Sequence, residues 1–210
     1  MINRSLNILI VLLVLLVVGI ETHTYWFYQL RPWQPSTSMG RLIFYYSFFT
    51  VLTNLMLAAS CLTLAIKPTC SSTFFSVIRL NGLVGVLITI IIYNILLRGV
   101  HRPPTLLLQL ANESLHVVIP ILGLLTWLIY GPFARITLKI VLYSFCSFLL
   151  YAIYIFVRGH ITGQYPYPFI NVSKIGYEKA LIAAGLIAML FFVLVGFLKI
   201  IAIIRLRIIK

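Results

Sequence analysis

Thr50 and His116 are the two side chains in this sequence whose types and setting point most directly to chemistry. Both lie in apolar runs, and His116 belongs to the segment NESLHVVIP, which places Asn112 and Glu113 within about one helical turn of it. A threonine hydroxyl attacks a carbonyl carbon when a neighbouring base removes its proton, and an imidazole is a suitable base. The pair therefore predicts nucleophilic attack on a carbonyl group, with Asn112 or Glu113 orienting the imidazole.

The expected helices would place both side chains at similar depths. A helix that starts at about residue 105, after Pro103 and Pro104, carries His116 about 16 Å along its axis, at a rise of about 1.5 Å per residue. A helix that enters after Arg41 carries Thr50 about 13 Å along its axis at the same rise. Pro120 has no N–H to offer the carbonyl of His116, so the backbone near the imidazole is predicted to be locally open.

Other interpretations of these residues are also compatible with the sequence. A helix that starts near Asn112 would use this residue as its N-cap and Glu113 against its dipole, although it would not require His116 or Pro120. A threonine in a membrane helix usually donates to its own i−4 carbonyl and serves packing. A histidine within a membrane can likewise be a packing residue with one hydrogen bond.

Membrane-spanning helices must position these residues. The composition is 62% hydrophobic and 9% charged, with a mean hydropathy of +1.10, which is typical of an integral membrane protein. Apolar runs of roughly 20 residues predict six helices, at about 5–23, 42–66, 77–98, 105–130, 137–157 and 179–204. The remaining loops are too short for a soluble domain. We therefore expect an all-α fold, a single six-helix transmembrane bundle over residues 1–210.

The three acids and four histidines all fall toward one predicted end of the bundle. They are Glu21, Glu113, Glu178, His23, His101, His116 and His160. Slightly more basic residues, among them Arg79, fall at the other end, which predicts that this end and both termini are cytoplasmic. The net charge of +13 is spread over both ends, so no nucleic-acid binding is expected. Membrane lipids are the expected contacts of the basic segment 199–210.

Four features of the sequence together resemble a known family. They are FFTVLTN at 48–54, Asn112 and His116 with a proline shortly after, Trp127, and YPYPF at 165–169. They are similar, over most of the chain, to bacterial relatives of the family of the androgen-induced transmembrane protein and the androgen-dependent TFPI-regulating protein. Members of that family are multi-pass hydrolases of fatty acid esters of hydroxy fatty acids, with an intramembrane threonine nucleophile and a histidine.

The resemblance implies that Thr50 is the nucleophile and His116 its partner, with a lipid or fatty acid ester as the substrate. An acyl-threonine would form and then be hydrolysed by water. Thr126 and Asn171 stand where the resemblance leads us to expect acids. The oxyanion would need hydrogen-bond donors. The candidates are Asn54, Tyr93, Asn94 and Arg98.

No metal is implied, because His116 and Glu113 supply two ligands at most, and no cofactor is expected. The loop 160–174, rich in aromatic residues and prolines, is predicted either to form a rim or lid over the site or to rest on lipid headgroups.

Two other classes of function are compatible with the sequence. A proton-linked transporter would use His116 and Glu113 as an intramembrane relay, although the sequence shows no inverted repeat or paired broken helices. A non-catalytic membrane subunit is the other class. Short loops favour the bacterial cytoplasmic membrane as the location, with the endoplasmic reticulum as the alternative. The sequence does not indicate oligomeric partners.

Overall fold

The computed structural model describes residues 2–100, 103–133 and 136–208. His101 and the basic residues Arg102 and Arg135 lie outside these described residues. Within them the chain forms helices, joined by turns and loops, and no strand. Six helices in the described part are long and apolar enough to cross a membrane, which confirms the predicted all-α, six-helix fold.

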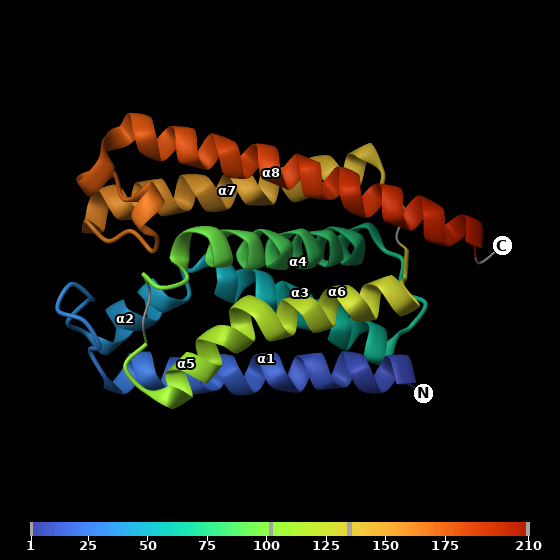
Figure 1. Ribbon diagram of the computed structural model, residues 1–210, viewed down its shortest axis with the longest axis horizontal. Coiled ribbons are helices and arrows are strands. Elements are labelled where there is room, and N and C mark those ends of the chain that lie inside the picture. Colours follow the sequence, from blue (N-terminus) through green and yellow to red (C-terminus); the bar gives the residue numbers. More distant parts are fainter. Residues whose placement is uncertain (1, 101–102, 134–135, 209–210) are drawn as a thin grey trace.

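The long helices run alongside one another and form an elongated bundle (Figure 1). They are α1 (Ile2–Phe27), α3 (Phe49–Ile66), α4 (Thr73–Ile92) with the π-helix η1 (Tyr93–Leu97), α5 (Leu106–Glu113) with the π-helix η2 (Ser114–Val118) and α6 (Ile119–Tyr130), α7 (Leu138–Thr162) and α8 (Val172–Ile208). The shorter elements are α2 (Ser38–Tyr45) and the 3₁₀ segment η3 (Pro168–Ile170). Helix α1 begins and α8 ends at one end of the bundle. The opposite end, where α3, α5 and α8 begin, is named the site end.

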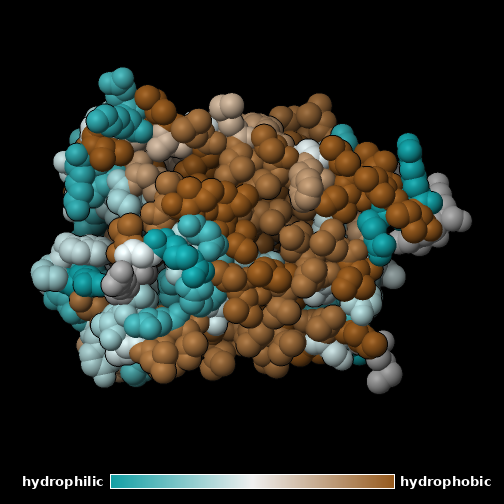
Figure 2. Space-filling model, viewed as in Figure 1, coloured by the Kyte–Doolittle hydropathy of each residue, from teal (hydrophilic) through white to brown (hydrophobic). Residues whose placement is uncertain are grey.

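Apolar side chains cover the middle of the bundle, as Figure 2 shows for one face, and hydrophilic residues gather mainly at the site end of that face. Large apolar residues are exposed along the outer helices α7 and α8. They include Leu150, Ile153, Leu186 and Met189. Such an apolar belt matches the hydrocarbon core of a bilayer. The chain is therefore a multi-pass integral membrane protein.

The main core lies where α1, α3, α4 and α6 meet, while α7 and α8 pack against α4. Val14, Leu57, Val84 and Ile119 are fully buried there. Gly82 lets α3 and α4 approach closely, because a Cβ at this position would lie 2.8 Å from the backbone nitrogen of Leu57. Small residues at helix crossings are a common way to bring membrane helices together. The close pairing of α3 and α4 fixes the position of the start of α3.

Side-chain caps begin several of the helices. Ser72, Thr105 and Thr137 precede α4, α5 and α7, and each hydroxyl accepts from the backbone N–H three residues later. Helix α3 differs, because its N-cap is Phe48, which has no side-chain hydrogen bond to offer. The first N–H groups of α3 must therefore find acceptors elsewhere in the fold.

The predicted span 42–66 is wrong in one respect, since the chain breaks within it. Helix α2 ends at Tyr45 and α3 begins at Phe49. At the break Ser47 donates through Oγ to the Ile43 carbonyl at 2.6 Å, and its own carbonyl accepts from the Tyr151 hydroxyl at 3.0 Å. One local contact and one contact from α7 thus hold a turn that the helical pattern of the sequence did not reveal. Thr50 is consequently the second residue of a helix, not a residue in the middle of one.

Other spans extend further than predicted. Helix α1 continues to Phe27 because Arg41 donates to the carbonyls of Tyr25 and Trp26, each at 2.8 Å, and so satisfies its last turn. Helix α7 continues to Thr162 and ends at Gly163, whose φ of +70° suits a helix terminus. Helix α8 begins at Val172 instead of near residue 179, with a non-helical residue at Gly176.

Arg79 is buried, although its predicted place was at a basic surface. Its exposed fraction is 1%, and it donates to Ser60 Oγ at 3.1 Å and Cys61 Sγ at 3.4 Å. The reason is that α4 begins at Thr73, before the predicted start at 77, so that Arg79 lies well inside the helix and faces α3. The side chain therefore contributes no charge to that surface.

Candidate active site

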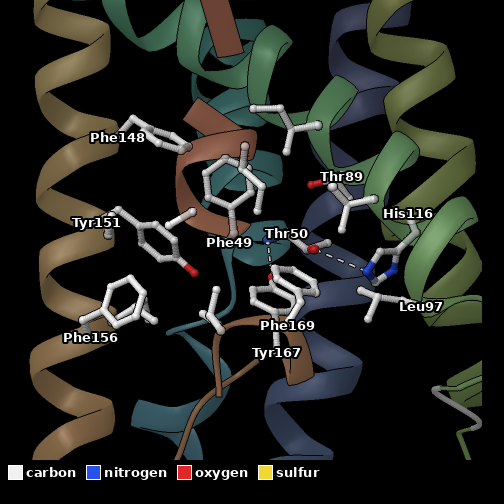
Figure 3. Close-up of a pocket in the computed structure, with 17 residues that line it drawn as sticks. Phe49, Thr50, Thr89, Leu97, His116, Phe148, Tyr151, Phe156, Tyr167 and Phe169 are labelled. Atoms are coloured by element: carbon white, nitrogen blue, oxygen red, sulfur yellow. Dashed lines mark hydrogen bonds between the residues drawn. The ribbon is translucent and has the colours of Figure 1, made fainter. Parts of the chain in front are cut away.

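Thr50 and His116 lie within hydrogen-bonding distance in the structure. The Oγ1 atom of Thr50 is 3.3 Å from Nε2 of His116, across 66 residues of sequence (Figure 3). Thr50 comes from the first turn of α3, and His116 from the middle of the π-helix η2. Thr50 is buried, with 5% of its surface exposed, and His116 is partly buried. The structure thus brings together the two side chains that sequence reasoning paired.

The second imidazole nitrogen fixes the tautomer of His116. Its Nδ1 atom is 2.8 Å from the backbone carbonyl oxygen of Asn112. A carbonyl oxygen only accepts hydrogen bonds, so Nδ1 must carry the proton in the neutral imidazole. Nε2 is then left with its lone pair and accepts from the Thr50 hydroxyl. The imidazole is oriented by a main-chain carbonyl, where we had expected the side chain of Asn112 or Glu113 to do so.

The backbone around His116 is opened by a π-helical turn. The N–H of Ile119 reaches back five residues to the carbonyl of Ser114, so it does not bond to Leu115. Pro120, the next residue that could reach the Leu115 carbonyl, has no N–H. The Leu115 carbonyl instead accepts from Nδ2 of Asn54 at 3.1 Å. The sequence pointed to an open backbone here, but at the carbonyl of His116 and not at that of Leu115.

Asn54 joins the two helices that carry Thr50 and His116. Its Nδ2 also donates to the Thr50 carbonyl at 2.8 Å, and the side chain is fully buried. Both amide protons are therefore donated to main-chain carbonyls, one to that of Thr50 and one to that of Leu115, the residue before His116. The residue sets the distance between α3 and η2, and it has no proton left for an oxyanion.

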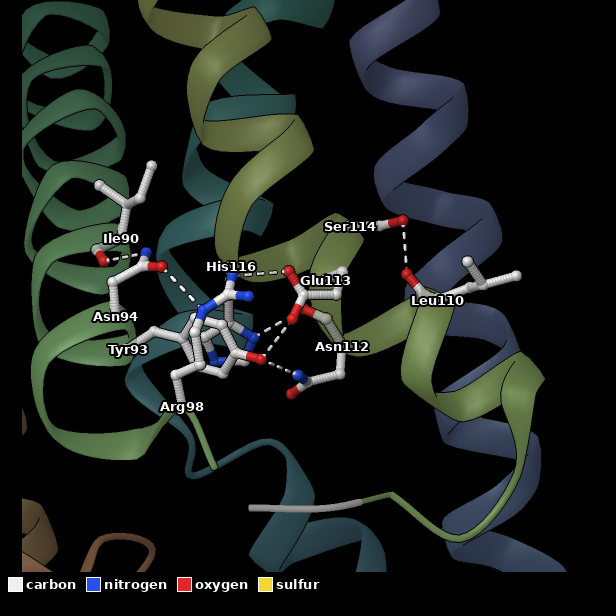
Figure 4. Close-up of polar contacts among 9 residues, drawn as sticks. All are labelled: Ile90, Tyr93, Asn94, Arg98, Leu110, Asn112, Glu113, Ser114 and His116. Atoms are coloured by element: carbon white, nitrogen blue, oxygen red, sulfur yellow. Dashed lines mark hydrogen bonds and ion pairs between the residues drawn. The ribbon is translucent and has the colours of Figure 1, made fainter. Parts of the chain in front are cut away.

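A second polar network supports the imidazole from the side of η1 (Figure 4). The ring of Tyr93 stacks on that of His116, with centroids 4.3 Å apart. Its hydroxyl donates to Glu113 Oε1 at 2.6 Å and accepts from Asn112 Nδ2 at 2.8 Å. Glu113 also pairs with Arg98 at 2.8 Å, and both of these side chains are roughly half exposed. The network packs the imidazole against η1.

The remaining predicted donors form hydrogen bonds with groups other than Thr50. Asn94 donates to the Ile90 carbonyl and accepts from Arg98 at 2.9 Å, at an exposed position. Arg98 is held by Asn94 and Glu113, with its guanidinium 5.0 Å from the centroid of the Tyr93 ring. The hydroxyl of Tyr93 already donates a hydrogen bond to Glu113. In this geometry Tyr93, Asn94 and Arg98 support the histidine side of the site.

Tyr167 is the residue at Thr50 that sequence reasoning did not select. Its hydroxyl accepts from the backbone N–H of Thr50 at 3.3 Å and so caps α3 in place of Phe48 (Figure 3). The ring packs edge-on against Phe48 and parallel to Phe169. Burial raises the pKa of Tyr167 above its ordinary value, so the hydroxyl remains protonated. A tyrosine between two prolines was the only local signal for this position.

An apolar cavity of about 80 Å³ opens from Thr50 and His116 toward the middle of the bundle. Its walls come from α3, α4, α7 and α8, together with the loop that carries Tyr167. Side chains that line it include Phe49, Ile88, Phe148, Phe156, Ala184 and Ile187. This lining suits a hydrocarbon chain better than a charged solute.

A larger polar cleft of about 550 Å³ lies on the other side of the same two residues, at the site end. Charged and amide side chains contribute to its walls. They include Glu21, Arg31, Gln34, Asn112, Gln164 and Lys174. Among the described residues, those that line both the apolar cavity and the polar cleft are Thr50, Leu97, His116 and Tyr167. The hydroxyl and imidazole therefore stand where an apolar space meets a polar one.

Asn171 and Thr126, where the resemblance suggests acids, lie in different surroundings. Asn171 precedes α8 and lines the polar cleft, where its Oδ1 atom is buried with no hydrogen-bond partner. Thr126 is buried in α6 and lines neither the apolar cavity nor the polar cleft. An acid at 171 would add negative charge to the cleft, whereas one at 126 would lie apart from Thr50 and His116.

Within the described residues, no group of three histidine, cysteine or acidic side chains is placed to hold a metal ion. Comparison of the chain with family profiles, with characterised proteins and with solved structures finds no match. The assignment of a function therefore rests on the geometry of Thr50, His116 and the two spaces that meet at them.

Proposed function

We propose that this protein is an intramembrane hydrolase of lipid esters, with Thr50 as the nucleophile and His116 as the base. The observation that carries the proposal is the contact between Thr50 Oγ1 and the unprotonated Nε2 of His116. The family resemblance suggests fatty acid esters of hydroxy fatty acids as the substrate class. No metal or cofactor takes part in the proposed reaction.

The proposed reaction has two halves. His116 Nε2 takes the proton from Thr50 Oγ1 as this oxygen attacks the ester carbonyl carbon, which forms a tetrahedral intermediate. The bond from carbon to the alcohol oxygen then breaks, and the imidazolium returns its proton to that oxygen. The alcohol leaves, and the acyl group stays on Thr50. Water attacks this acyl-threonine with His116 again as the base, which releases the fatty acid and restores the hydroxyl.

The two spaces beside the pair suit the two ends of such a substrate. The acyl chain would lie in the apolar cavity, and the polar part of the alcohol in the polar cleft, so that the ester stands beside Thr50. Water for the second half would come from the cleft, whose walls carry charged and amide groups. Lysine and arginine in these walls, such as Lys174, suit an anionic end group.

Hydrolysis of a branched fatty acid ester by the purified protein in detergent tests the proposal. We expect Thr50→Val and His116→Ala each to lower kcat by at least about 1,000-fold, as removal of a nucleophile or its base does in other hydrolases. Thr50→Ser should retain part of the activity, because it keeps a hydroxyl. Thr63→Val, on the same helix with its hydroxyl bonded to Ala59, is the matched control and should be fully active.

Each variant must elute as a monodisperse species with a wild-type helical circular dichroism spectrum. A wild-type protein that hydrolyses no ester, or a Thr50→Val variant as active as the wild type, would contradict the proposal. In the first case proton-coupled transport through His116 and Glu113 becomes the function to test.

The proposed location is the bacterial cytoplasmic membrane, with both termini in the cytoplasm and the site end outside. The proposal is supported by the placement of the acids and the His116 site at the end of the bundle opposite the termini. Labelling of single cysteines by an impermeant maleimide tests it. A cysteine in the loop 163–171 should react in intact cells, and one in the loop 67–72 only after lysis. The reverse pattern would invert the orientation, and the endoplasmic reticulum is the alternative location.

A further inference from the structure

The oxyanion of the proposed reaction needs a donor, and the arrangement of protons around Thr50 singles out one. In the structure both amide protons of Asn54 are used on main-chain carbonyls. The hydroxyl proton of Tyr93 is donated in a hydrogen bond to Glu113. Neither residue can therefore donate to a new negative charge at Thr50 without breaking an existing hydrogen bond.

The hydroxyl of Tyr167 is arranged differently. Its oxygen accepts from the backbone N–H of Thr50 at 3.3 Å, whereas the proton of the Thr50 hydroxyl is directed to Nε2 of His116. An oxygen that accepts on this side has to direct its own proton to another side. Tyr167 lines both the apolar cavity and the polar cleft, so that side includes the space in which the ester would lie.

The Tyr167 ring is held firmly in place. It packs edge-on against Phe48 with centroids 5.5 Å apart, and it stacks on Phe169 with centroids 5.2 Å apart. Proline precedes and follows it in the sequence, which limits the backbone on both sides. A donor fixed before the reaction stabilises developing charge more effectively than one that must reorganise.

We infer that the Tyr167 hydroxyl donates to the oxyanion of the tetrahedral intermediate on Thr50, with the N-terminus of α3 adding its positive end beside it. This inference rests on the proposed hydrolase function. When Oγ1 of Thr50 attacks, the former carbonyl oxygen is bonded to the same carbon as Oγ1. The oxyanion therefore forms next to the first turn of α3, where the Tyr167 oxygen already lies. Tyr167 is then a catalytic residue that contacts the reacting atoms.

Tyr167→Phe is the direct test, because it removes the hydroxyl and keeps the packing ring. We expect kcat for a branched fatty acid ester to fall about 100- to 1,000-fold, the range for loss of one oxyanion donor, with KM changed by less than about threefold. Tyr177→Phe is the matched control. Its hydroxyl contacts Nδ1 of His160 at an exposed position and lines neither space, so its kcat should stay at the wild-type value.

A tetrahedral adduct separates a catalytic role from a structural one. A long-chain alkyl trifluoromethyl ketone should add to Thr50 and place an oxyanion where the ester does. Tyr167→Phe should raise the dissociation constant of this inhibitor by the same factor by which it lowers kcat/KM. The affinity for the product fatty acid should stay unchanged.

The outcomes distinguish this inference from the proposed function. If the wild type hydrolyses the ester and Tyr167→Phe keeps its kcat, Tyr167 is no oxyanion donor and the hydrolase proposal stands. A fall in activity that accompanies a lower unfolding temperature, with inhibitor affinity unchanged, also overturns the inference. If the wild type neither hydrolyses the ester nor binds the ketone, both the function and the role of Tyr167 fail.

Discussion

At the scale of single residues, the site depends on which atoms carry protons. His116 directs an unprotonated Nε2 toward Thr50 because Nδ1 carries the proton and donates it in a hydrogen bond to the Asn112 carbonyl. Asn54 uses both its protons to hold the carbonyls of Thr50 and Leu115. Each of these assignments follows from a carbonyl that can only accept, and each can be tested by a substitution that changes the donor and keeps the shape.

Asn54→Asp replaces the donating amide with a carboxyl group of nearly the same shape. The two carbonyls then lose their shared donor, and burial of an acceptor without a partner costs about 1–3 kcal/mol. We expect a lower unfolding temperature and a kcat at least about tenfold lower, since small displacements of catalytic groups have large effects on rate. Asn94→Asp, at an exposed position, should leave the unfolding temperature almost unchanged. Wild-type values of both quantities in Asn54→Asp would show that this residue does not join the two helices.

A plot of kcat/KM against pH should rise to a plateau and should not fall again at moderately high pH. The base form of His116 is neutral, so kcat/KM should fall as the pH is lowered and the imidazole gains a proton. Burial raises the pKa of Tyr167, so its hydroxyl stays protonated up to at least about pH 10. The initial rate, corrected for spontaneous hydrolysis, should therefore rise to a plateau that persists to about pH 9.5. A decline in kcat/KM between about pH 8 and about pH 9.5 would show that a group with an ordinary or lowered pKa donates the proton.

At the scale of elements, irregular backbone positions both catalytic side chains. The break between α2 and α3 turns Thr50 into a first-turn residue, and the π-helix η2 frees a carbonyl beside His116. A second π-helix, η1, carries Tyr93 onto the imidazole. Such π-helical turns are rare and frequently occur at functional sites. Both π-helices interrupt membrane-spanning helices, and both lie where the chemistry is proposed.

Pro120→Ala tests whether the irregular turn matters. Alanine supplies the N–H that proline lacks, so a regular helix becomes easier to form and competes with Asn54 for the carbonyls near His116. We expect the unfolding temperature to be equal or higher and kcat to be lower, by as much as about 100-fold if the ring moves by about 1 Å. Kinetics and thermal unfolding in the same detergent provide the measurement. An unchanged kcat would mean that η2 forms without the proline.

Sequence patterns predicted the regular elements well and the irregular ones poorly. Apolar runs of the right length identify membrane spans because the bilayer imposes them. The turn at Ser47 depends on Tyr151 and Tyr154, about 105 residues away, and no local pattern contains that contact. The same holds for Tyr167 and for Arg79, whose surroundings come from other parts of the chain. Pro120 was the exception, since its missing N–H can be read directly.

At the scale of the whole molecule, the two outer helices α7 and α8 close one side of the apolar cavity. Ala184 of α8 lines it, and the larger Phe148 and Ile187 stand nearby in its walls. The polar cleft lies at the site end, so the bundle offers an apolar space and a polar space on either side of one hydroxyl. The volume of the apolar cavity should then limit the length of the acyl chain.

Ala184→Phe fills part of that space. We expect kcat/KM for an ester with a long acyl chain to fall at least about tenfold, because an added ring in a packed cavity displaces the chain. The value for a short acyl chain should change little. Ala183→Phe, at the next position of α8 and outside the cavity lining, is the matched control and should keep the wild-type preference. If kcat/KM falls equally for both chain lengths, or equally in both variants, the acyl chain lies elsewhere.

The central claim is that Thr50 carries the acyl group during turnover. Acid quenching of the wild-type protein during hydrolysis, followed by peptide mass spectrometry, tests it most directly. We predict that the peptide containing Thr50 gains the mass of the acyl group, with fragment ions that locate it on Thr50. His116→Ala and Thr50→Val should show no such adduct under the same conditions. Ester turnover by the wild type with no acyl group on Thr50, or with one on another residue, would contradict the mechanism.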